Sequence, residues 1–203
     1  MIRSVVFDIG GVLLHWDPRA VYRQLIDDEA EIDRFLGEVL TMEWNLALDA
    51  GRSFDEACAE LAARHPDDAE LIHAWKRQDE MIVGEVAGAG ELVQRLRVAG
   101  VPLYLLTNMP QDVFEARLAS WSILEGFDGA IVSGGEKVVK PSPEIFGLLT
   151  TRFGLVPTET LFIDDSAANV RGAEAAGFGG HHFTGAADLE ARLIELGLLD
   201  GSG

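Results

Sequence analysis

The sequence predicts an α/β fold, a doubly wound parallel sheet of the Rossmann type with a small helical domain inserted after the first strand. Two observations support this fold class. Four short aliphatic runs are each followed by polar or glycine-containing residues, and helical patterns lie between and after them. One long interval after the first run breaks this alternation, because it contains several amphipathic stretches but no convincing strand.

The four aliphatic runs are predicted to form buried parallel strands, and they lie at residues 2–7, 101–106, 130–132 and 161–163. Three of the helical patterns that accompany them end at a glycine, as helices commonly do. The four helical patterns cover residues 90–99, 112–120, 142–153 and 166–176, and the second of them is the one not followed by a glycine. We also expect His181 and His182 to end a last strand at the edge of the sheet.

The interval from residue 15 to residue 86 is interpreted as an all-helical insertion. Its amphipathic stretches lie at residues 18–27, 29–40, 54–64 and 67–81. The α/β domain then consists of residues 1–14 together with residues 87–203. The glycine-rich segment 84–90 fits either a hinge or a plain loop. The terminal residues 201–203 are expected to fray.

Composition places the chain among folded globular proteins and excludes several functions. Of its 203 residues, 48% are hydrophobic and 25% are charged, which is near the average for such proteins. The formal net charge of −18 repels nucleic acid and anionic lipid, so neither is expected as a partner. No apolar run reaches the length of a membrane span, and Arg3 and Asp8 interrupt the N-terminal one, so we expect a cytoplasmic chain. The single cysteine, Cys58, excludes an internal disulfide and is expected to be buried.

Polar residues follow the first two predicted strands at the points where these strands end. Asp8 follows the first strand and precedes two glycines. Thr107 and Asn108 follow the second strand, where a hydroxyl, an amide and the backbone N–H groups of the next helix suit an anionic oxygen. Taken separately, each of these residues is also a common turn or helix-capping residue.

The last two predicted strands are followed by charged residues. Lys140 precedes Pro141, which holds the backbone of the lysine extended and so gives its side chain a fixed direction. Asp164 and Asp165 are adjacent carboxylates at the end of a buried strand, where like charges require a cation. The carboxyl ends of parallel strands meet at one edge of a sheet, so all these groups are expected together there. Together they suit a divalent cation and a phosphoryl group.

At these positions the chain resembles the haloacid dehalogenase-like (HAD) hydrolase superfamily. Its four motifs match, in order, the segments FDIGGVLL, LLTN, KPSP and IDDSAANV. The helical insertion resembles the small cap that many members carry after the first motif. The resemblance implies a Mg²⁺-dependent phosphohydrolase acting on a small phosphorylated metabolite through an aspartyl-phosphate intermediate. It also assigns roles to matching residues: Asp8 as the nucleophile, Thr107 and Lys140 as ligands of the transferring group, and Asp8, the Gly10 carbonyl and Asp165 as Mg²⁺ ligands, with Asp164 in or near the metal shell.

Gly10 departs from the pattern of this superfamily, most of whose phosphatases have a second aspartate there as the general acid and base. General acid–base help is worth ~10²–10⁴ in rate, so slow turnover or a substrate with a good leaving group is expected. Sugar 1-phosphates and acyl phosphates are such substrates. The first motif also resembles a bacterial branch that includes glucose-1-phosphate phosphatases. His15 or Asp17 could replace the acid, or could serve only as linker residues.

Within the insertion, residues 43–49 are the segment most expected to face the site, because they combine an aromatic ring, an amide and carboxylates. Trp44 is accordingly a candidate substrate-binding residue, alongside Thr107, Asn108 and Lys140. Aromatic residues at helical spacing can equally form the core of the insertion.

Two alternatives to a phosphatase are left open by the sequence. A 2-haloacid dehalogenase of the same superfamily needs neither metal nor an acid at position 10, but the pair Asp164 and Asp165 would repel its carboxylate substrate. A catalytically silent binding or regulatory protein is suggested only by Gly10.

Overall fold

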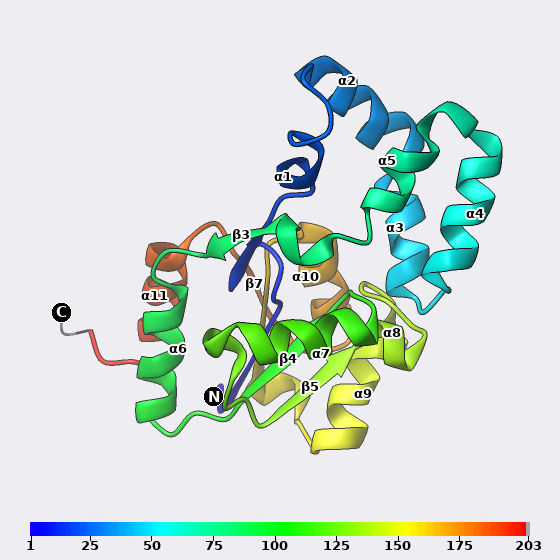
Figure 1. Ribbon diagram of the computed structural model, residues 1–203. Coiled ribbons are helices and arrows are strands. Elements are labelled where there is room, and N and C mark those ends of the chain that lie inside the picture. Colours follow the sequence, from blue (N-terminus) through cyan, green and yellow to red (C-terminus); the bar gives the residue numbers. More distant parts are fainter. Residues whose placement is uncertain (202–203) are drawn as a thin grey trace.

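The computed structural model describes residues 1–201, and at its centre is a five-stranded parallel sheet (Figure 1). The strand order is β5-β4-β1-β6-β7. All four predicted strands are present, and the predicted edge strand that ends at His182 is the fifth. Their bounds are Ser4–Phe7 for β1, Leu103–Thr107 for β4, Gly129–Val132 for β5, Thr160–Asp164 for β6 and Gly179–His182 for β7. The expectation for Ser202 and Gly203 lies outside the described residues.

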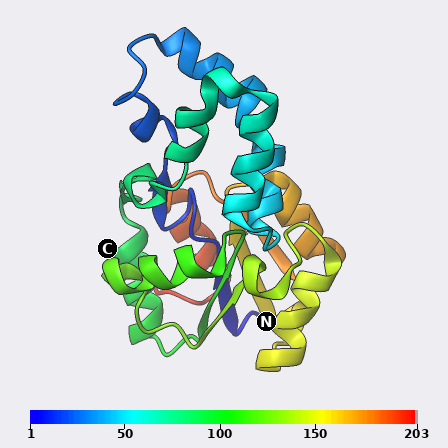
Figure 2. The ribbon, with the colours of Figure 1, turned by 45° about the vertical axis from the view of Figure 1, so that its right-hand side comes forward.

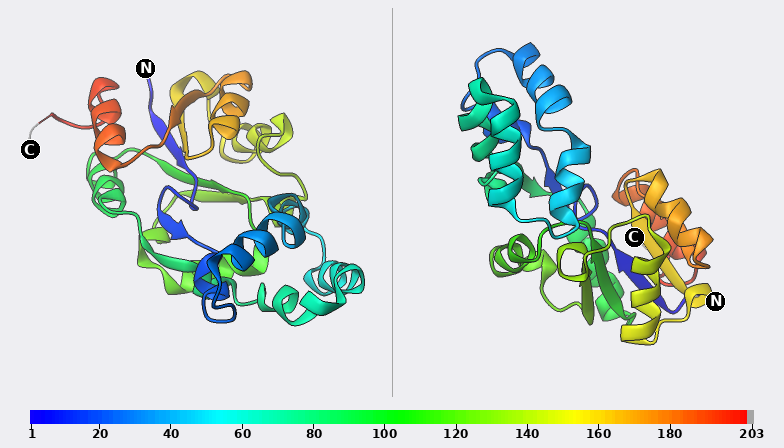
Figure 3. Two further views of the ribbon diagram at one scale, coloured as in Figure 1. Left: turned by 90° about the horizontal axis from the view of Figure 1, so that it is seen from above. Right: turned by 90° about the vertical axis from the view of Figure 1, so that its right-hand side faces the viewer.

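Helices cover both faces of the sheet (Figure 3), because successive side chains of each strand point to opposite faces. Val5 and Phe7 of β1 pack on one face, in a cluster with apolar residues of α6 (Ala89–Val98), α7 (Gln111–Ser120) and α11 (Ala186–Glu195). Val6 packs on the other face, with α9 (Pro143–Phe153) and α10 (Ala167–Ala175). A short helix, α8 (Ser133–Glu136), and 3₁₀ turns at Ser122–Leu124 and Pro157–Glu159 complete the connections. The predicted doubly wound fold is confirmed.

A helical insertion, here called the cap and comprising residues 17–81, follows β1 and stands apart from the helices of the sheet (Figure 2). It has a hydrophobic core of its own, which includes Tyr22, Phe35 and Trp75, and Cys58 is buried there as expected. Its elements are α1 (Arg19–Tyr22), α2 (Glu29–Arg34), a π-helical turn (Phe35–Val39), α3 (Met42–Asp49), α4 (Phe54–Arg64), α5 (Ala69–Ala74) and 3₁₀ turns at Pro66–Asp68 and Gln78–Met81.

The expectation that residues 15–86 contain no strand was wrong at both ends of this interval. The strands β2 (Leu14–Trp16) and β3 (Ile82–Glu85) pair antiparallel at the base of the cap. Both are too short for the alternation of apolar and polar residues to show in the sequence. Gly84 is part of β3, so the segment 84–90 begins as a paired strand and not as a loop.

The cap is fixed to the carboxyl edge of the sheet through the end of α3. The Ser133 hydroxyl, directly after β5, donates a hydrogen bond of 2.6 Å to the backbone carbonyl of Asp49. A Cβ on Gly51 would lie 2.7 Å from the carbonyl oxygen of Gly134, so the backbones of cap and sheet domain are in direct contact. Along residues 1–201, no helix has both the length and the apolar character that crossing a membrane requires.

Candidate active site

The polar residues that follow the four strands meet at the carboxyl edge of the sheet, as their positions predict. Asp8 follows β1, Thr107 ends β4, and Asp164 ends β6. A pocket of about 310 Å³ at this edge is lined by Asp8, Gly10, Thr107, Asn108, Lys140 and Asp165, among others. Asp164 is fully buried and does not line the pocket, but its carboxylate accepts a hydrogen bond from Lys140.

The Lys140 ammonium is the centre of the charge network. Its Nζ lies 2.9 Å from Asp8 Oδ1 and 2.7 Å from Asp164 Oδ2, and it donates to the Leu106 carbonyl at 3.0 Å. All three donors of the ammonium are therefore used, and the side chain is fully buried. The Asn108 carboxamide bonds to the backbone of the same lysine, so its side chain positions Lys140.

Three carboxylates lie close enough to share one cation. Oxygen atoms of Asp8, Asp164 and Asp165 lie within 4.8 Å of one another. Asp164 also accepts hydrogen bonds from Ser166 N at 2.8 Å and from Asn169 Nδ2 at 3.0 Å, so its carboxylate has a fixed orientation. Carboxylate oxygens are the preferred ligands of Mg²⁺, and this donor set fits that ion.

Gly11 leaves the space that the Asp165 carboxylate occupies. A Cβ at Gly11 would overlap Asp165 Oδ2, and the φ of Gly11 is +71°, where glycine is favoured. The second of the two glycines after Asp8 therefore permits this carboxylate to approach the first strand end. Gly10 differs, because no atom would lie within 4 Å of a Cβ there.

Burial and neighbouring charges both shift the pKa values of these groups. Burial raises the pKa of Asp8 to about 7, although the charge of Lys140 lowers it. Burial raises the pKa of Asp165 as well, and the neighbouring Asp164 adds to this effect. For Lys140, burial would lower the pKa, but Asp8 and Asp164 outweigh burial and the pKa is raised. A further cation at these carboxylates would stabilise the ionised form of Asp8.

The cap closes the pocket from above and supplies several of its lining residues. Asn45, Leu46 and Asp49 of α3 line it, which confirms that the segment 43–49 faces the site. Trp44, in contrast, does not line this pocket. Its ring packs edge-on against Trp75 with the centroids 6.1 Å apart, in the core of the cap. Adjacent residues of a helix point in different directions, so Asn45 faces the pocket and Trp44 does not.

Comparison with known protein families covers most of the chain. The model of the haloacid dehalogenase-like hydrolase family matches residues 2–177, which include β1, the cap and the strand ends described above. The chain belongs to this family.

Within the HAD family, a relative similar over its whole length is the sesquiterpene phosphatase astK of Aspergillus oryzae, 28% identical over 98% of this chain and 97% of the relative. A HAD-like hydrolase from Porphyromonas gingivalis is 27% identical with a TM-score of 0.71, covering 97% of this chain and 98% of that one. A HAD enzyme from Bacteroides thetaiotaomicron, solved with magnesium and inorganic phosphate, shares the fold at 22% identity and a TM-score of 0.64, covering 89% and 93% of the two chains.

Two charged residues of this HAD-family pocket were not predicted as individual site residues, namely Asp49 and Arg117. Arg117 follows Phe114 by three positions on α7, and both side chains are buried. Residues three apart share a helix face, so a basic residue on the face of a buried aromatic was the signal available in the sequence. Asp49 lay at the end of a segment that was expected to face the site, but its burial could not be predicted.

His15 and Asp17, the two residues considered as replacement acids, do not line the pocket. Asp17 Oδ1 accepts a hydrogen bond of 3.0 Å from Arg19 N, and Oδ2 lies 3.3 Å from Arg23 Nη1. His15 is exposed on β2. The structure therefore gives both residues a place in the linker and not in the active site of this hydrolase.

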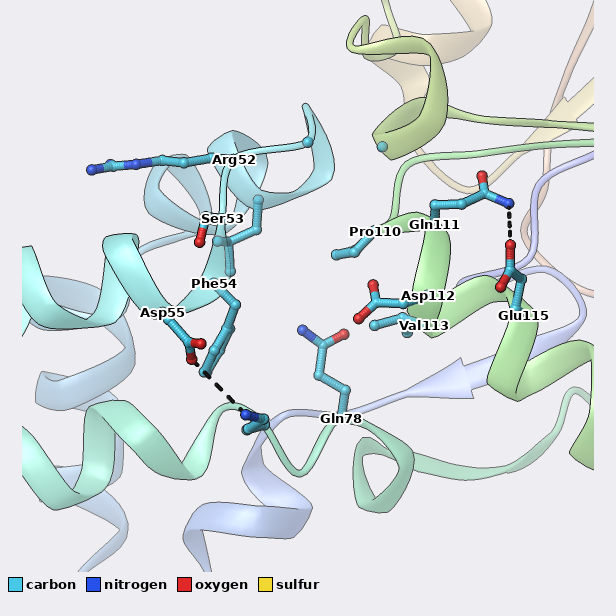
Figure 4. Close-up of a pocket in the computed structure, with 14 residues that line it drawn as sticks. Arg52, Ser53, Phe54, Asp55, Gln78, Pro110, Gln111, Asp112, Val113 and Glu115 are labelled. Atoms are coloured by element: carbon cyan, nitrogen blue, oxygen red, sulfur yellow. Dashed lines mark hydrogen bonds and ion pairs between the residues drawn. The ribbon is translucent and has the colours of Figure 1, made fainter.

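A second cavity of about 570 Å³ adjoins the pocket between the α3–α4 turn and the start of α7. Gln78 lines both cavities, and Figure 4 shows its side chain pointing between Phe54 and Asp112. None of the residues implicated in chemistry lines this second cavity.

Proposed function

We propose that the protein is a Mg²⁺-dependent phosphatase that cleaves the phosphate monoester of a small metabolite through an aspartyl-phosphate on Asp8. The observation that carries this proposal is the cluster of Asp8, Asp164 and Asp165, whose oxygens lie within 4.8 Å of one another beside the Lys140 ammonium. The phosphatase activity named for the Aspergillus relative supports it, as does the magnesium and phosphate complex of the Bacteroides enzyme.

The residues that would hold the metal are Asp8, the backbone carbonyl of Gly10 and Asp165, with Asp164 in or near the metal shell. Mg²⁺, when bound, would offset the repulsion between the Asp8 carboxylate and the dianionic phosphate. A bound cation would favour the charged form of Asp8. The Asp8 carboxylate would then be ionised already and would need no base to activate it.

Each remaining residue has a role that follows from its position. An oxygen of Asp8 attacks phosphorus, the bond from phosphorus to the ester oxygen breaks, and the aspartyl-phosphate is then hydrolysed by water. Lys140, 2.9 Å from the nucleophile, offsets the negative charge that gathers on the phosphoryl oxygens. The buried hydroxyl of Thr107 donates to one of these oxygens, and Asn108 holds Lys140 in place while lining the same pocket.

A sugar phosphate is the candidate substrate that Gly10 favours. An anomeric phosphate leaves more readily than a simple alkyl phosphate, so it depends less on a general acid. The pocket volume of about 310 Å³ is at the lower end of the range for small-molecule sites. Specificity among such substrates would come from the residues that the cap contributes to the pocket.

The test is a screen of phosphate release from a metabolite panel, run with Mg²⁺ and with EDTA. We expect release that requires Mg²⁺ and that EDTA abolishes. 2-Chloropropionate belongs in the same panel, because a dehalogenase would release chloride from it without metal. Chloride release in EDTA with no ester cleaved would replace the phosphatase by the dehalogenase alternative, and no turnover of any compound would favour a silent member.

A further inference from the structure

Arg117 is a buried cation that forms no ion pair within residues 1–201. Only 4% of the residue is exposed, and its Nε has no hydrogen-bond partner. The guanidinium makes one weak contact, from Nη1 to Met109 Sδ at 3.8 Å. The charges of Asp79 and Asp49 act on it, but within residues 1–201 neither carboxylate forms an ion pair with it, although every N–H of a buried guanidinium needs an acceptor.

This guanidinium lines the active-site pocket at some distance from the nucleophile. The charges that act on Asp8 are those of Lys140 and Asp164. Asp49 experiences the charges of Arg117, Lys140 and Asp8. Arg117 acts on Asp49 but is not among the charges that act on Asp8, so it lies nearer to Asp49 than to the nucleophile. A phosphate bound at Asp8 and Lys140 would leave Arg117 facing the rest of the substrate.

We propose that Arg117 binds a second anionic group, a carboxylate or a second phosphate, on the leaving-group portion of the substrate. This proposal rests on the proposed phosphatase function. A guanidinium offers two parallel N–H donors that match either group, and such charge-assisted hydrogen bonds are among the strongest available. The amide side chain of Gln78 lines the same pocket and suits a hydroxyl group of the substrate.

The experiment compares matched substrate pairs that differ by one anionic group. 3-Phosphoglycerate against glycerol 3-phosphate tests a carboxylate, and fructose 1,6-bisphosphate against fructose 1-phosphate, with release of the 1-phosphate followed in both, tests a second phosphate. We expect one anionic member to be favoured about 10- to 100-fold in kcat/KM. Arg117→Met should reduce this ratio to near one, and Arg117→Lys should retain part of it. Arg64→Met, on an exposed arginine of α4, should leave the ratio as it is.

Two results separate this proposal from the proposed function. If p-nitrophenyl phosphate is hydrolysed but neither anionic member is favoured, the second subsite is wrong and the phosphatase remains. If no ester is hydrolysed, the phosphatase itself is wrong. A thermal melt of Arg117→Met shows whether the variant folds; if it does not, the substrate ratio of Arg117→Lys decides, and a ratio equal to that of the unmodified protein contradicts the proposal.

A different observation bears on the missing acid at Gly10. Among the lining residues, the carboxyl groups are those of Asp8, Asp165 and Asp49, and only Asp49 stands outside the three-carboxylate cluster. Its orientation is fixed by a chain of hydrogen bonds. Trp75 Nε1 donates to Asn45 Oδ1 at 3.1 Å, and Asn45 Nδ2 donates to Asp49 Oδ2 at 3.1 Å. The residue is 7% exposed.

We propose that Asp49, from the cap, protonates the leaving oxygen in place of the residue absent at position 10. As the bond between phosphorus and the ester oxygen breaks, that oxygen takes the electron pair and accepts the proton of Asp49. The Asp49 carboxylate then takes a proton from the water that hydrolyses the aspartyl-phosphate, which restores the starting state. This second proposal also rests on the proposed phosphatase function.

The electrostatic setting of Asp49 suits an acid at neutral pH. Burial raises the pKa of Asp49 to about 7, against the lowering effect of Arg117 from α7 and Lys140, while Asp8 adds to the rise. A general acid must be protonated to act, so a pKa near 7 predicts that activity on poor leaving groups falls as pH rises above that value.

The experiment measures kcat for an alkyl and an aryl phosphate between pH 5 and pH 9. Asp49→Asn should lower kcat for the alkyl ester by about 10²–10⁴, lower it far less for the aryl ester, and remove the loss of activity above about pH 7. Asp67→Asn, on an exposed aspartate of the cap, should change neither. Equal losses on the two esters with the pH profile retained would show a merely structural role for Asp49. No activity in the unmodified protein would instead contradict the phosphatase function.

Discussion

The side-chain amide of Asn108 holds the backbone of Lys140 from both sides. Its Oδ1 accepts a hydrogen bond of 2.8 Å from Lys140 N, and its Nδ2 donates one of 3.1 Å to the Lys140 carbonyl. Asn108 follows β4, whereas Lys140 lies in the loop between α8, which follows β5, and α9, so the pair joins the segments that follow two neighbouring strands. The oxygen and the nitrogen of the amide that was expected to bind substrate are thus both hydrogen-bonded to the lysine backbone.

Replacing Asn108 should therefore disturb Lys140. Each buried hydrogen bond is worth about 1 kcal/mol, so Asn108→Ala should lower the free energy of unfolding by about 2 kcal/mol in urea titration. It should also lower kcat about tenfold, because the Lys140 ammonium would no longer be held beside Asp8. Gln94→Ala, at an exposed position of α6, is the control that should retain both values. A change in KM alone would indicate that Asn108 acts on the substrate and not on Lys140.

Asp8→Asn should fold and be inactive. The amide retains the shape of the carboxylate but lacks the charge that attacks phosphorus. Folding is checked by circular dichroism, and activity by phosphate release. Beryllium fluoride, a mimic of the phosphoryl group, should be found on Asp8 in a crystal of the unmodified protein. Undiminished turnover by Asp8→Asn would mean that water attacks phosphorus directly.

Asp165→Asn should remove the response to Mg²⁺. The variant retains the size of the side chain that fits against Gly11 but weakens the cluster of carboxylates. Calorimetric titration with Mg²⁺ should show binding to the unmodified protein and to Asp27→Asn, an exposed control, but much weaker binding to Asp165→Asn. If Asp165→Asn were fully active in EDTA, the metal-dependent function would have to be abandoned.

The sequence predicted the sheet and the residues at its edge because both are local patterns. Each aliphatic run ends in a polar group, and a parallel sheet brings all such ends together, so Asp8, Thr107 and Lys140 could be placed without knowing any contact. The cap followed other rules. Whether a helix residue faces the pocket or the interior of the cap depends on how helices pack, which is why helical spacing alone led to Trp44 as the lining residue of this segment and did not single out Asp49.

The short ribbon of β2 and β3 was missed for a related reason. Its strands are joined by the whole cap, and His15 pairs with Gly84, sixty-nine positions further along the sequence. Three or four residues are too few for a periodic signal, and the pairing depends on where the cap ends. The burial of Arg117 could not be predicted either, because it depends on the contacts that α7 makes with the pocket and not on the sequence of α7 itself.

Gly10 offers a way to restore an acid where most phosphatases of the family carry one. Its backbone lies outside the left-handed region, and no atom lies within 4 Å of the position that a Cβ would take, so Gly10→Asp should be accommodated without strain. The substitution is best tested in the Asp49→Asn variant, because that variant should hydrolyse alkyl phosphates poorly and aryl phosphates well. Adding Gly10→Asp should raise kcat for the alkyl ester more than for the aryl ester, because only the alkyl oxygen needs a proton as it leaves.

Gly11→Asp is the matched control. The φ of Gly11 is +71° and a Cβ there would overlap Asp165, so this variant should lose stability in a thermal melt and activity in a rate assay. If Gly10→Asp folds as stably as its parent yet changes the two rates by the same factor, protonation of the leaving oxygen does not limit either reaction, and neither residue serves as the acid.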